Sequence, residues 1–352
     1  MSNRRTRIIS TIVMLFIAGQ LRSAMASDLP GPDGEEANHG KKVQVFILMG
    51  ESNMLGFGRI EPQNRNGTLA NLIQENGMYG HLIDDEGKWS ERKDVRNVHV
   101  MCGKVMKNEW LGAQGKHIGP DLQFGYIMGH FHDEPVLILK SCTDNRSLGL
   151  DLLPPGSEQF EFEGRVYAGY KDTPSSWVKG EPKEVVNWYA GKQYDIDVSE
   201  AKRVLSDLSE FYPGYKDQGY DIAGFVFWQG HKDQNAAHAS RYEQNLAQFI
   251  KTLRKEFHAP DAKFVCATIA FGGEELSGHG LTVANAQLAV SGEKGKYPEF
   301  KGNVMTIDAR PFWIEEEYSP SGAGHYYNHN AETYMEVGNA FGWAMVDLLR
   351  RQ

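Results

Sequence analysis

The pattern that most constrains this chain is an alternation of short apolar segments with longer amphipathic ones. Apolar runs of strand length lie at 43–49, 136–140, 222–228, 264–269 and 304–307. Helical periodicity follows or separates them at 121–131, 199–211, 241–257 and 331–349. Buried strands alternating with amphipathic helices are typical of a mostly parallel sheet covered on both faces. The sequence therefore predicts the α/β class.

This fold class also predicts where a functional site lies. Right-handed crossovers bring the carboxyl ends of parallel strands to one edge of the sheet, and ligands bind in the crevice outside that edge. Side chains that directly follow a predicted strand can meet there. Residues 57–118 and 151–195 fit no simple helix or strand pattern, so we expect them to be loops that form walls over the crevice.

The N-terminus has the order of a secretory signal peptide. Arg4, Arg5 and Arg7 precede an apolar run at 8–19, and Ala24-Met25-Ala26 supplies a small-residue cleavage site. We expect a signal peptide over residues 1–26 and a secreted or periplasmic protein. An uncleaved anchor is the alternative, although the apolar run is short for a bilayer.

The rest of the chain predicts a flexible leader and one domain. Residues 27–42 are rich in Pro, Gly and charge, and 43–352 is long enough for one α/β domain. The net charge of -9 and the scattered Lys and Arg predict no nucleic-acid partner. No later segment approaches 20 apolar residues, so we expect no membrane contact after signal cleavage. The oligomeric state stays open.

Ser52 follows the first predicted strand, between Gly50 and Gly56. A serine beyond a buried strand and flanked by glycines lies where a tight turn exposes its hydroxyl at the sheet edge. The N–H groups of Ser52 and Asn53 are then available to a developing oxyanion. The segment lacks the G-x-S-x-G pattern of α/β-hydrolases. The alternative is a serine that caps a structural turn.

Three further polar segments are predicted at the same edge. Asn145 lies after the second strand, where residues 141–147 supply substrate contacts or form an Asx-type turn. The run from Gln229 to Asp233 follows the third strand, and the loop before the last helix contains His325 and His329. Either histidine is a candidate general base. A serine, an imidazole that accepts its proton and an orienting carboxylate together predict acyl transfer.

Three blocks of the sequence resemble the sialate O-acetylesterase and carbohydrate esterase family 6 branch of the SGNH hydrolases. Residues 46–56 are similar to the family's G-Q-S-N-M block, 224–230 to its W-Q-G block, and His325-Tyr326 with the following 330–338 to its histidine block. The blocks occur in family order. The resemblance implies a three-layer α/β/α, flavodoxin-like fold and ester hydrolysis that needs neither a metal nor another cofactor.

The resemblance also implies roles for individual residues. Ser52 is the implied nucleophile, and His325 is preferred to His329 as the base because His-Tyr is the family pairing. Gln229 is the best match for a side-chain oxyanion donor. The candidate oxyanion and substrate-binding residues are Asn53, Asn145, Gln229 and Gly230.

The sequence departs from the family pattern in ways that affect these roles. Glu51 stands where the family usually has Gln, and His231 replaces the Glu of Q-G-E-S-D. Thr143-Asp144-Asn145 replaces a Gly-Gly pair. An unusual oxyanion hole and an altered acyl specificity are expected consequences.

The acid of the triad departs as well, because Gly322 occupies the position three residues before His325, where the family has Asp. Asp233 retains the Asp of the third block, so we predict it as the acid. Asp308 is the second choice, and a dyad that uses a backbone carbonyl is the third.

Three functions follow from these observations. The leading hypothesis is an exported serine esterase that removes O-acetyl groups from a polysaccharide or a sialic-acid-like sugar through an acyl-enzyme on Ser52. The second is a non-catalytic glycan-binding protein on an SGNH scaffold, because an acid and two glycines are missing. The third is a metal-dependent hydrolase, which lacks a tight ligand motif such as H-E-x-x-H. Its candidate ligands are His231, Asp233, Asp308, His325 and His329.

Overall fold

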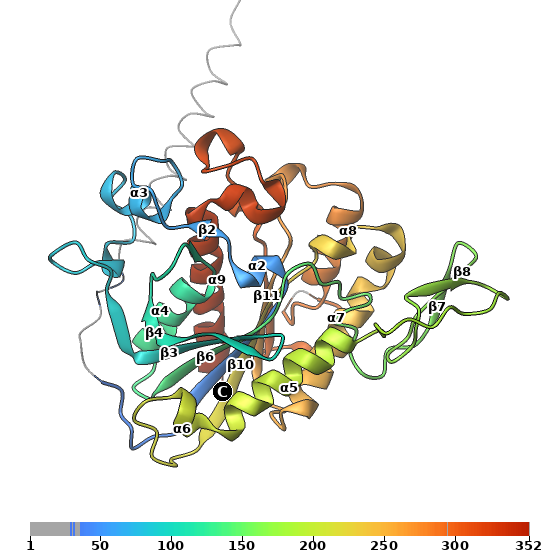
Figure 1. Ribbon diagram of the computed structural model, residues 1–352, viewed down its shortest axis with the longest axis horizontal. Helices are drawn as coiled ribbons and strands as arrows, with labels where there is room; N and C mark the ends of the chain where they lie inside the picture. Colours follow the sequence, from blue (N-terminus) through green and yellow to red (C-terminus); the bar gives the residue numbers. More distant parts are fainter. Residues whose placement is uncertain (1–28, 30, 32–35, 294, 352) are drawn as a thin grey trace, which may run out of the picture.

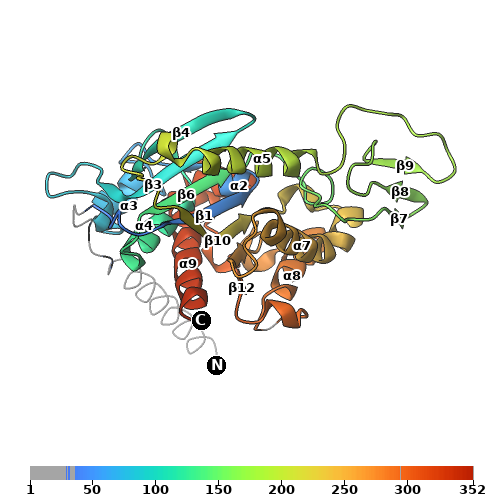
Figure 2. The same ribbon diagram turned by 90° about the horizontal axis from the view of Figure 1, so that it is seen from below.

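The structure of the protein is a computed structural model that describes residues 29, 31, 36–293 and 295–351. The predicted signal peptide, 1–26, lies outside the described residues, as does much of the predicted leader, 27–42. The described body is a central sheet between two layers of helices (Figure 1, Figure 2). The predicted three-layer α/β/α architecture is confirmed.

In the described part of the chain, seven strands form the central sheet in the order β12-β11-β10-β1-β6-β3-β4. β4 pairs antiparallel with β3, whereas the other neighbours pair in parallel. The order β6-β1-β10-β11-β12 is the flavodoxin-like arrangement, whose switch point lies between β1 and β10. The strands are β1 (Val43–Gly50), β3 (Glu91–Met101), β4 (Lys104–Gly112), β6 (Val136–Ser141), β10 (Tyr220–Trp228), β11 (Lys263–Ala267) and β12 (Val304–Ile307).

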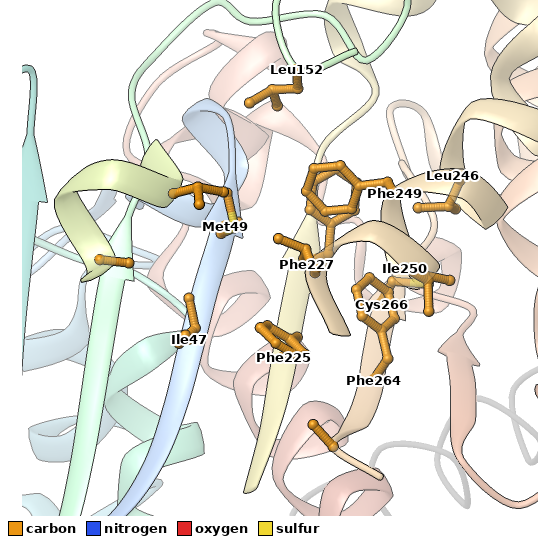
Figure 3. Packing of buried hydrophobic residues seen from close by; sticks show 14 of the residues in the cluster. Ile47, Met49, Leu152, Phe225, Phe227, Leu246, Phe249, Ile250, Phe264 and Cys266 are labelled. Atoms are coloured by element: carbon orange, nitrogen blue, oxygen red, sulfur yellow. The ribbon is translucent and has the colours of Figure 1, made fainter. Parts of the chain in front are cut away.

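The long helices cover the two faces of this sheet. They are α4 (Asp121–Phe131) and α9 (Ala331–Arg350) on one face, and α5 (Lys192–Ser206) and α7 (Ala236–Glu256) on the other. Side chains alternate along β1, so that Phe46 packs with the α4 and α9 cluster and Ile47 with the opposite one. In the second cluster, Phe225 and Phe227 of β10 lie against α7, as Figure 3 shows. The buried aromatic side chains fix the sheet between its helices.

Smaller elements decorate this core. A three-stranded antiparallel sheet, β7-β8-β9, projects away from the body in both views (Figure 1, Figure 2). No helix among the described residues is long and apolar enough to cross a membrane. The remaining elements are α2 (Ser52–Leu55), β2 (Gly58–Arg59), α3 (Leu69–Gln74), β5 (His117–Ile118), β7 (Phe160–Phe162), β8 (Arg165–Tyr167), β9 (Ser176–Val178), α6 (Leu208–Phe211) and α8 (Gly278–Ala289).

Regions predicted as loops contain regular structure, which corrects the sequence interpretation. Residues 57–118 supply β3 and β4, and 151–195 supply β7, β8, β9 and the start of α5. β3 is polar in sequence because its buried arginines have partners. Arg92 pairs with Asp94 at 2.5 Å, and Arg96 donates to the backbone oxygen of Asn108 at 2.6 Å. Charged side chains that have such partners can be buried, so a strand that contains them lacks the apolar pattern from which strands are predicted.

Candidate active site

Ser52 begins α2 directly after β1, at the switch point of the sheet. The turn needs Gly50, whose φ is +152°, because a Cβ there would lie 2.2 Å from the backbone oxygen of Trp228. Ser52 is 3% exposed. The N–H groups of Ser52 and Asn53 lie in the first turn of a helix, and neither has a partner within the described structure. Both donors are therefore free for a ligand oxygen.

Glu51 anchors this turn to the loop after β10. Its Oε1 accepts the backbone N–H groups of Gly230 at 2.8 Å and His231 at 2.7 Å, while Oε2 is buried without a partner in the described structure. Burial raises the pKa of Glu51 to about 8; the Gly230 N–H opposes this shift and the nearby Asp233 adds to it. The side chain is thus largely protonated at neutral pH. A neutral carboxyl is a close match in shape to the Gln expected there.

Asp233 is fully buried and ties two strand-end loops together. Its carboxylate accepts the backbone N–H of Leu148 at 2.7 Å, the N–H of Gly149 at 2.8 Å and Nε2 of Gln229 at 2.7 Å. His238 Nδ1 lies 3.2 Å from Oδ1 without hydrogen-bond geometry. Asp233 makes no hydrogen bond to His325, so its predicted role as the orienting acid has no geometric support here.

Gln229 and Gly230, the other predicted oxyanion donors of this block, have partners inside the protein. Gln229 is fully buried; its Nε2 also donates to the backbone oxygen of Arg146 at 2.8 Å, and its Oε1 accepts the hydroxyl of Tyr242 at 2.8 Å. The N–H of Gly230 is bound by Glu51. The W-Q-G block therefore holds the site together, and its donors are not free for a substrate in this structure.

Asn145 lies at the rim of the same edge. Its φ is +57°, its side chain is exposed, and Oδ1 accepts Nζ of Lys232 at 2.9 Å. No hydrogen bond from the Asn145 side chain to the backbone is found in the described structure, so Asn145 does not form the predicted Asx-type turn. The Asn145 side chain thus links the loop after β6 to the loop after β10.

His325 lies in a 3-10 segment, Gly324–His329, directly before α9. It is exposed and makes no hydrogen bond within the described structure, including none to Ser52. Its ring lies 4.1 Å from that of Tyr326 and 6.2 Å from that of His231, between ring centroids. Tyr326 in turn donates its hydroxyl to Asp144 at 2.9 Å. The structure thus places a second histidine beside His325 and a carboxylate on the hydroxyl of the adjacent Tyr326.

Sequence reasoning gave Asp144 no catalytic role and named His231 only as a candidate metal ligand. Both residues occupy positions where the sequence departs from the family pattern. These departures were the signal in the sequence that could have pointed to them. Burial, and then the neighbouring His325, lower the pKa of His231, while Asp144 opposes the shift. The substituted positions of the two blocks therefore meet at one edge.

The alternative base and acid, His329 and Asp308, are held elsewhere. Nδ1 of His329 lies 2.8 Å from the backbone oxygen of Phe57, and its ring stacks on His117 with centroids 5.9 Å apart. Asp308 forms a two-point ion pair with Arg310. No group of three or more His, Cys, Asp or Glu among the described residues is placed to hold a metal ion.

A buried ion pair supports the other end of α2. Lys140 donates to Asp121 at 2.7 Å and to the backbone oxygens of Leu55 at 3.0 Å and Met54 at 3.4 Å. Asn97 donates to the same Asp121 carboxylate at 3.1 Å. A cation at the carboxyl end of a helix stabilises its free carbonyls. The Ser52 helix is thus held at its start by Glu51 and at its end by Lys140.

Comparison with known families identifies part of the chain. Residues 175–319 match the model of a family described as carbohydrate esterase, sialic acid-specific acetylesterase. The predicted family resemblance is confirmed. The segment that matches this esterase family contains the W-Q-G block and Asp233, whereas Ser52 and His325 lie outside it. At the level of the family, the match supports an esterase that acts on acetylated carbohydrate.

The similar solved structures have low sequence identity to this chain. A protein from Arabidopsis thaliana has 16% sequence identity and a TM-score of 0.48, covering 86% of this chain and 97% of its own. A carbohydrate acetylesterase from Xanthomonas citri has 12% identity and a TM-score of 0.48, with coverages of 88% and 57%. NanS has 12% identity and a TM-score of 0.48, with coverages of 89% and 99%. No curated protein sequence matches significantly.

Proposed function

We propose that this protein is an exported serine esterase that removes O-acetyl groups from a carbohydrate through an acyl-enzyme on Ser52. The observation that carries the proposal is the position of Ser52. It stands at the sheet's switch point, beside two free N–H groups and on the edge that also carries His325. The esterase family match of residues 175–319 supports the reaction class.

In the proposed reaction, the Ser52 turn provides the nucleophile and the oxyanion donors, and the histidine loop provides the base. Ser52 Oγ attacks the acetyl carbonyl while His325 accepts the serine proton, and the N–H groups of Ser52 and Asn53 donate to the oxyanion. The sugar alkoxide leaves with the proton from His325, and water then hydrolyses the acetyl-serine by the same route. Substrate binding brings His325 to hydrogen-bond distance of Oγ, since catalytic contacts are often long before substrate binds.

In this proposal Asp144, and not Asp233, is the carboxylate that assists His325. It accepts the hydroxyl of Tyr326, whose ring packs on His325. A carboxylate in that position stabilises the imidazolium that forms during acyl transfer, without a direct hydrogen bond. The base is therefore part of a Ser52–His325 dyad with a nearby negative charge.

The direct test is hydrolysis of p-nitrophenyl acetate and acetylated xylan by the purified protein and by Ser52→Ala. We expect Ser52→Ala to lose activity by about 10³-fold or more, since triad nucleophiles contribute at least that much. Ser206→Ala, at the exposed end of α5, is the matched control and should retain full activity. Equal activity of Ser52→Ala and wild type on both esters would refute the nucleophile assignment.

One observation favours the second candidate function, a non-catalytic glycan-binding protein. The predicted oxyanion donors Gln229 and Gly230 are bound within the protein, which leaves fewer donors for a transition state. A fluorophosphonate probe separates the two functions. Labelling of Ser52, located by peptide mass mapping, supports the esterase. Glycan binding without labelling supports the binding protein.

A further inference from the structure

A cavity of about 350 Å³ lies beside the Ser52 helix, on the side of β3 and β4. Its walls come from Leu55 to Phe57 after α2, from the carboxyl end of β3, from β4 and from residues 112–119. Small-molecule sites in proteins typically enclose about 300–1,000 Å³. The cavity is therefore large enough for a sugar unit, and none of the roles assigned above to Ser52 or His325 uses it.

The interior of the cavity presents an unmatched acceptor. Asn97 is 3% exposed, and while its Nδ2 donates to Asp121, its Oδ1 has no partner among the described residues. His99 also lines the cavity, and burial together with the nearby Lys140 lowers its pKa to about 4, so the ring is neutral at pH 7. A buried acceptor without a donor is costly unless a ligand supplies one. Sugar hydroxyls are donors of that kind.

The charge of the cavity differs from that of the whole protein. Lys107, Lys116 and Lys140 line it, against the single carboxylate of Asp121, in a chain whose net charge is -9. Lys107 also pairs with Glu109 outside the lining at 3.1 Å. Lys116 is exposed and has no ion pair in the described structure. Because Lys140 pairs with Asp121 at 2.7 Å, Lys116 is the lining lysine without an ion pair in the described structure, and its charge favours an anionic ligand.

The cavity adjoins the proposed reaction centre through one aromatic wall. Phe57 lines the cavity and stacks on Tyr326, with ring centroids 4.1 Å apart, and Tyr326 packs on His325. Met101 and Met106 add apolar surface to the lining. A sugar ring in the cavity would have apolar side chains against its faces and would lie next to an ester held at Ser52.

We propose that this cavity is a substrate subsite for an acidic sugar unit, carrying a carboxylate or a sulfate, next to the unit that bears the acetyl ester. Lys116 provides the charge contact, and Asn97 Oδ1 accepts a hydroxyl. This proposal rests on the proposed esterase function and adds the class of substrate to it.

The test compares acetylated xylo-oligosaccharides of equal length that are neutral, carry a glucuronate branch or carry a sulfate. The readout is the ratio of kcat/KM for each acidic substrate to that for the neutral one. We expect wild type to prefer at least one acidic substrate. In Lys116→Glu this ratio should fall about tenfold, the effect of losing one charge-assisted contact. Lys104→Glu, an exposed change of the same charge outside the lining, should retain the wild-type ratio.

The outcomes separate failure of the subsite from failure of the esterase. Equal kcat/KM of wild type on neutral and acidic substrates overturns the subsite alone, and so does an equal loss of preference in Lys116→Glu and Lys104→Glu. If wild type hydrolyses no ester, the esterase function fails, and calorimetric binding of the glucuronate and sulfate oligosaccharides then decides the subsite. Tighter binding by wild type than by Lys116→Glu supports it, and equal binding overturns it.

Discussion

The two parts of the candidate site are held in opposite ways. The turn at Glu51 and Ser52 is buried and is bound to the loop after β10 by hydrogen bonds through Glu51, Gln229 and Asp233. The His325 loop is exposed at its histidine and keeps its shape with positive φ at three successive residues, 327–329. Ser52, the proposed nucleophile, therefore lies in a turn held by hydrogen bonds, whereas His325, the proposed base, makes no hydrogen bond in the described structure.

This difference shows that polar residues in a block that resembles a family pattern can hold loops together without contacting the substrate. The W-Q-G block and Asp233 have the composition of a catalytic strand end, yet their polar atoms bind one another and the neighbouring loops. Substitutions at Glu51, Gln229 and Asp233 should mainly change stability, whereas substitutions in the histidine loop should change catalysis. The predictions below test that separation.

The largest effect is expected in the exposed loop. His325→Ala should lower kcat on p-nitrophenyl acetate by about 10²–10⁴-fold, the usual contribution of a general base. Its free energy of unfolding should stay within about 0.5 kcal/mol of wild type, because the side chain is exposed and makes no hydrogen bond. His329→Ala is the matched variant and should retain kcat within a few-fold. The opposite pattern would assign the base to His329.

Asp233→Ala should give the largest loss of stability. It removes the acceptor of the backbone N–H groups of Leu148 and Gly149 and of Gln229 Nε2, all in a buried place. We expect a loss of about 3 kcal/mol or more in unfolding free energy, since each unsatisfied buried donor costs about 1–3 kcal/mol. Asp308→Ala, which breaks a partly exposed pair with Arg310, should cost about 1 kcal/mol or less. Urea unfolding of both variants measures these two losses of unfolding free energy. Equal losses would contradict the structural role of Asp233.

The sequence predicted the parts of the fold that depend on local pattern. The bounds of α4 and β12 coincide with the predicted 121–131 and 304–307, because both segments are short and mostly apolar. The hydrophobic pattern did not predict elements whose burial depends on partners that are distant in the sequence. β3 is buried although it reads as charged, and α8 was missed because its sequence, which contains two glycines, has weak helical signal.

For the candidate site, too, the sequence predicted positions but not long-range contacts. The strand-end rule placed Ser52, Gln229 and His325 at one edge, which the structure shows. It did not reveal that Asp233 is occupied by Leu148 and Gly149, since those contacts join residues about 85 positions apart. Composition showed which side chains are available at an edge, but their hydrogen-bond partners depend on the packing of separate loops.

Glu51→Gln should change the pH dependence of stability. Because the pKa of Glu51 is raised from 4.5 to about 8 on folding, its stabilising contribution is complete below about pH 4.5 and is lost as pH rises to about 8. Between these values the wild type should lose up to about 1.4 kcal/mol per pH unit relative to Glu51→Gln. Urea unfolding from pH 5 to pH 9 measures this difference. Parallel stability curves would show that Glu51 is ionised at neutral pH.

Tyr326→Phe should have the smallest effect, and it tests whether Asp144 influences the base. The change removes the hydroxyl that donates to Asp144 at 2.9 Å and keeps the ring that packs on His325 and Phe57. A hydrogen bond of this kind contributes about 1 kcal/mol, so kcat/KM should fall about fivefold. Tyr318→Phe, at an exposed tyrosine of the same loop region, should have no effect.

Separate values of kcat and KM distinguish catalysis from packing in this variant. If the Tyr326 hydroxyl holds the Asp144 carboxylate where it stabilises the imidazolium that forms during acyl transfer, its loss lowers kcat and leaves KM unchanged. A rise in KM with kcat unchanged would make Tyr326 a packing residue and would leave Ser52 and His325 as a dyad without a carboxylate.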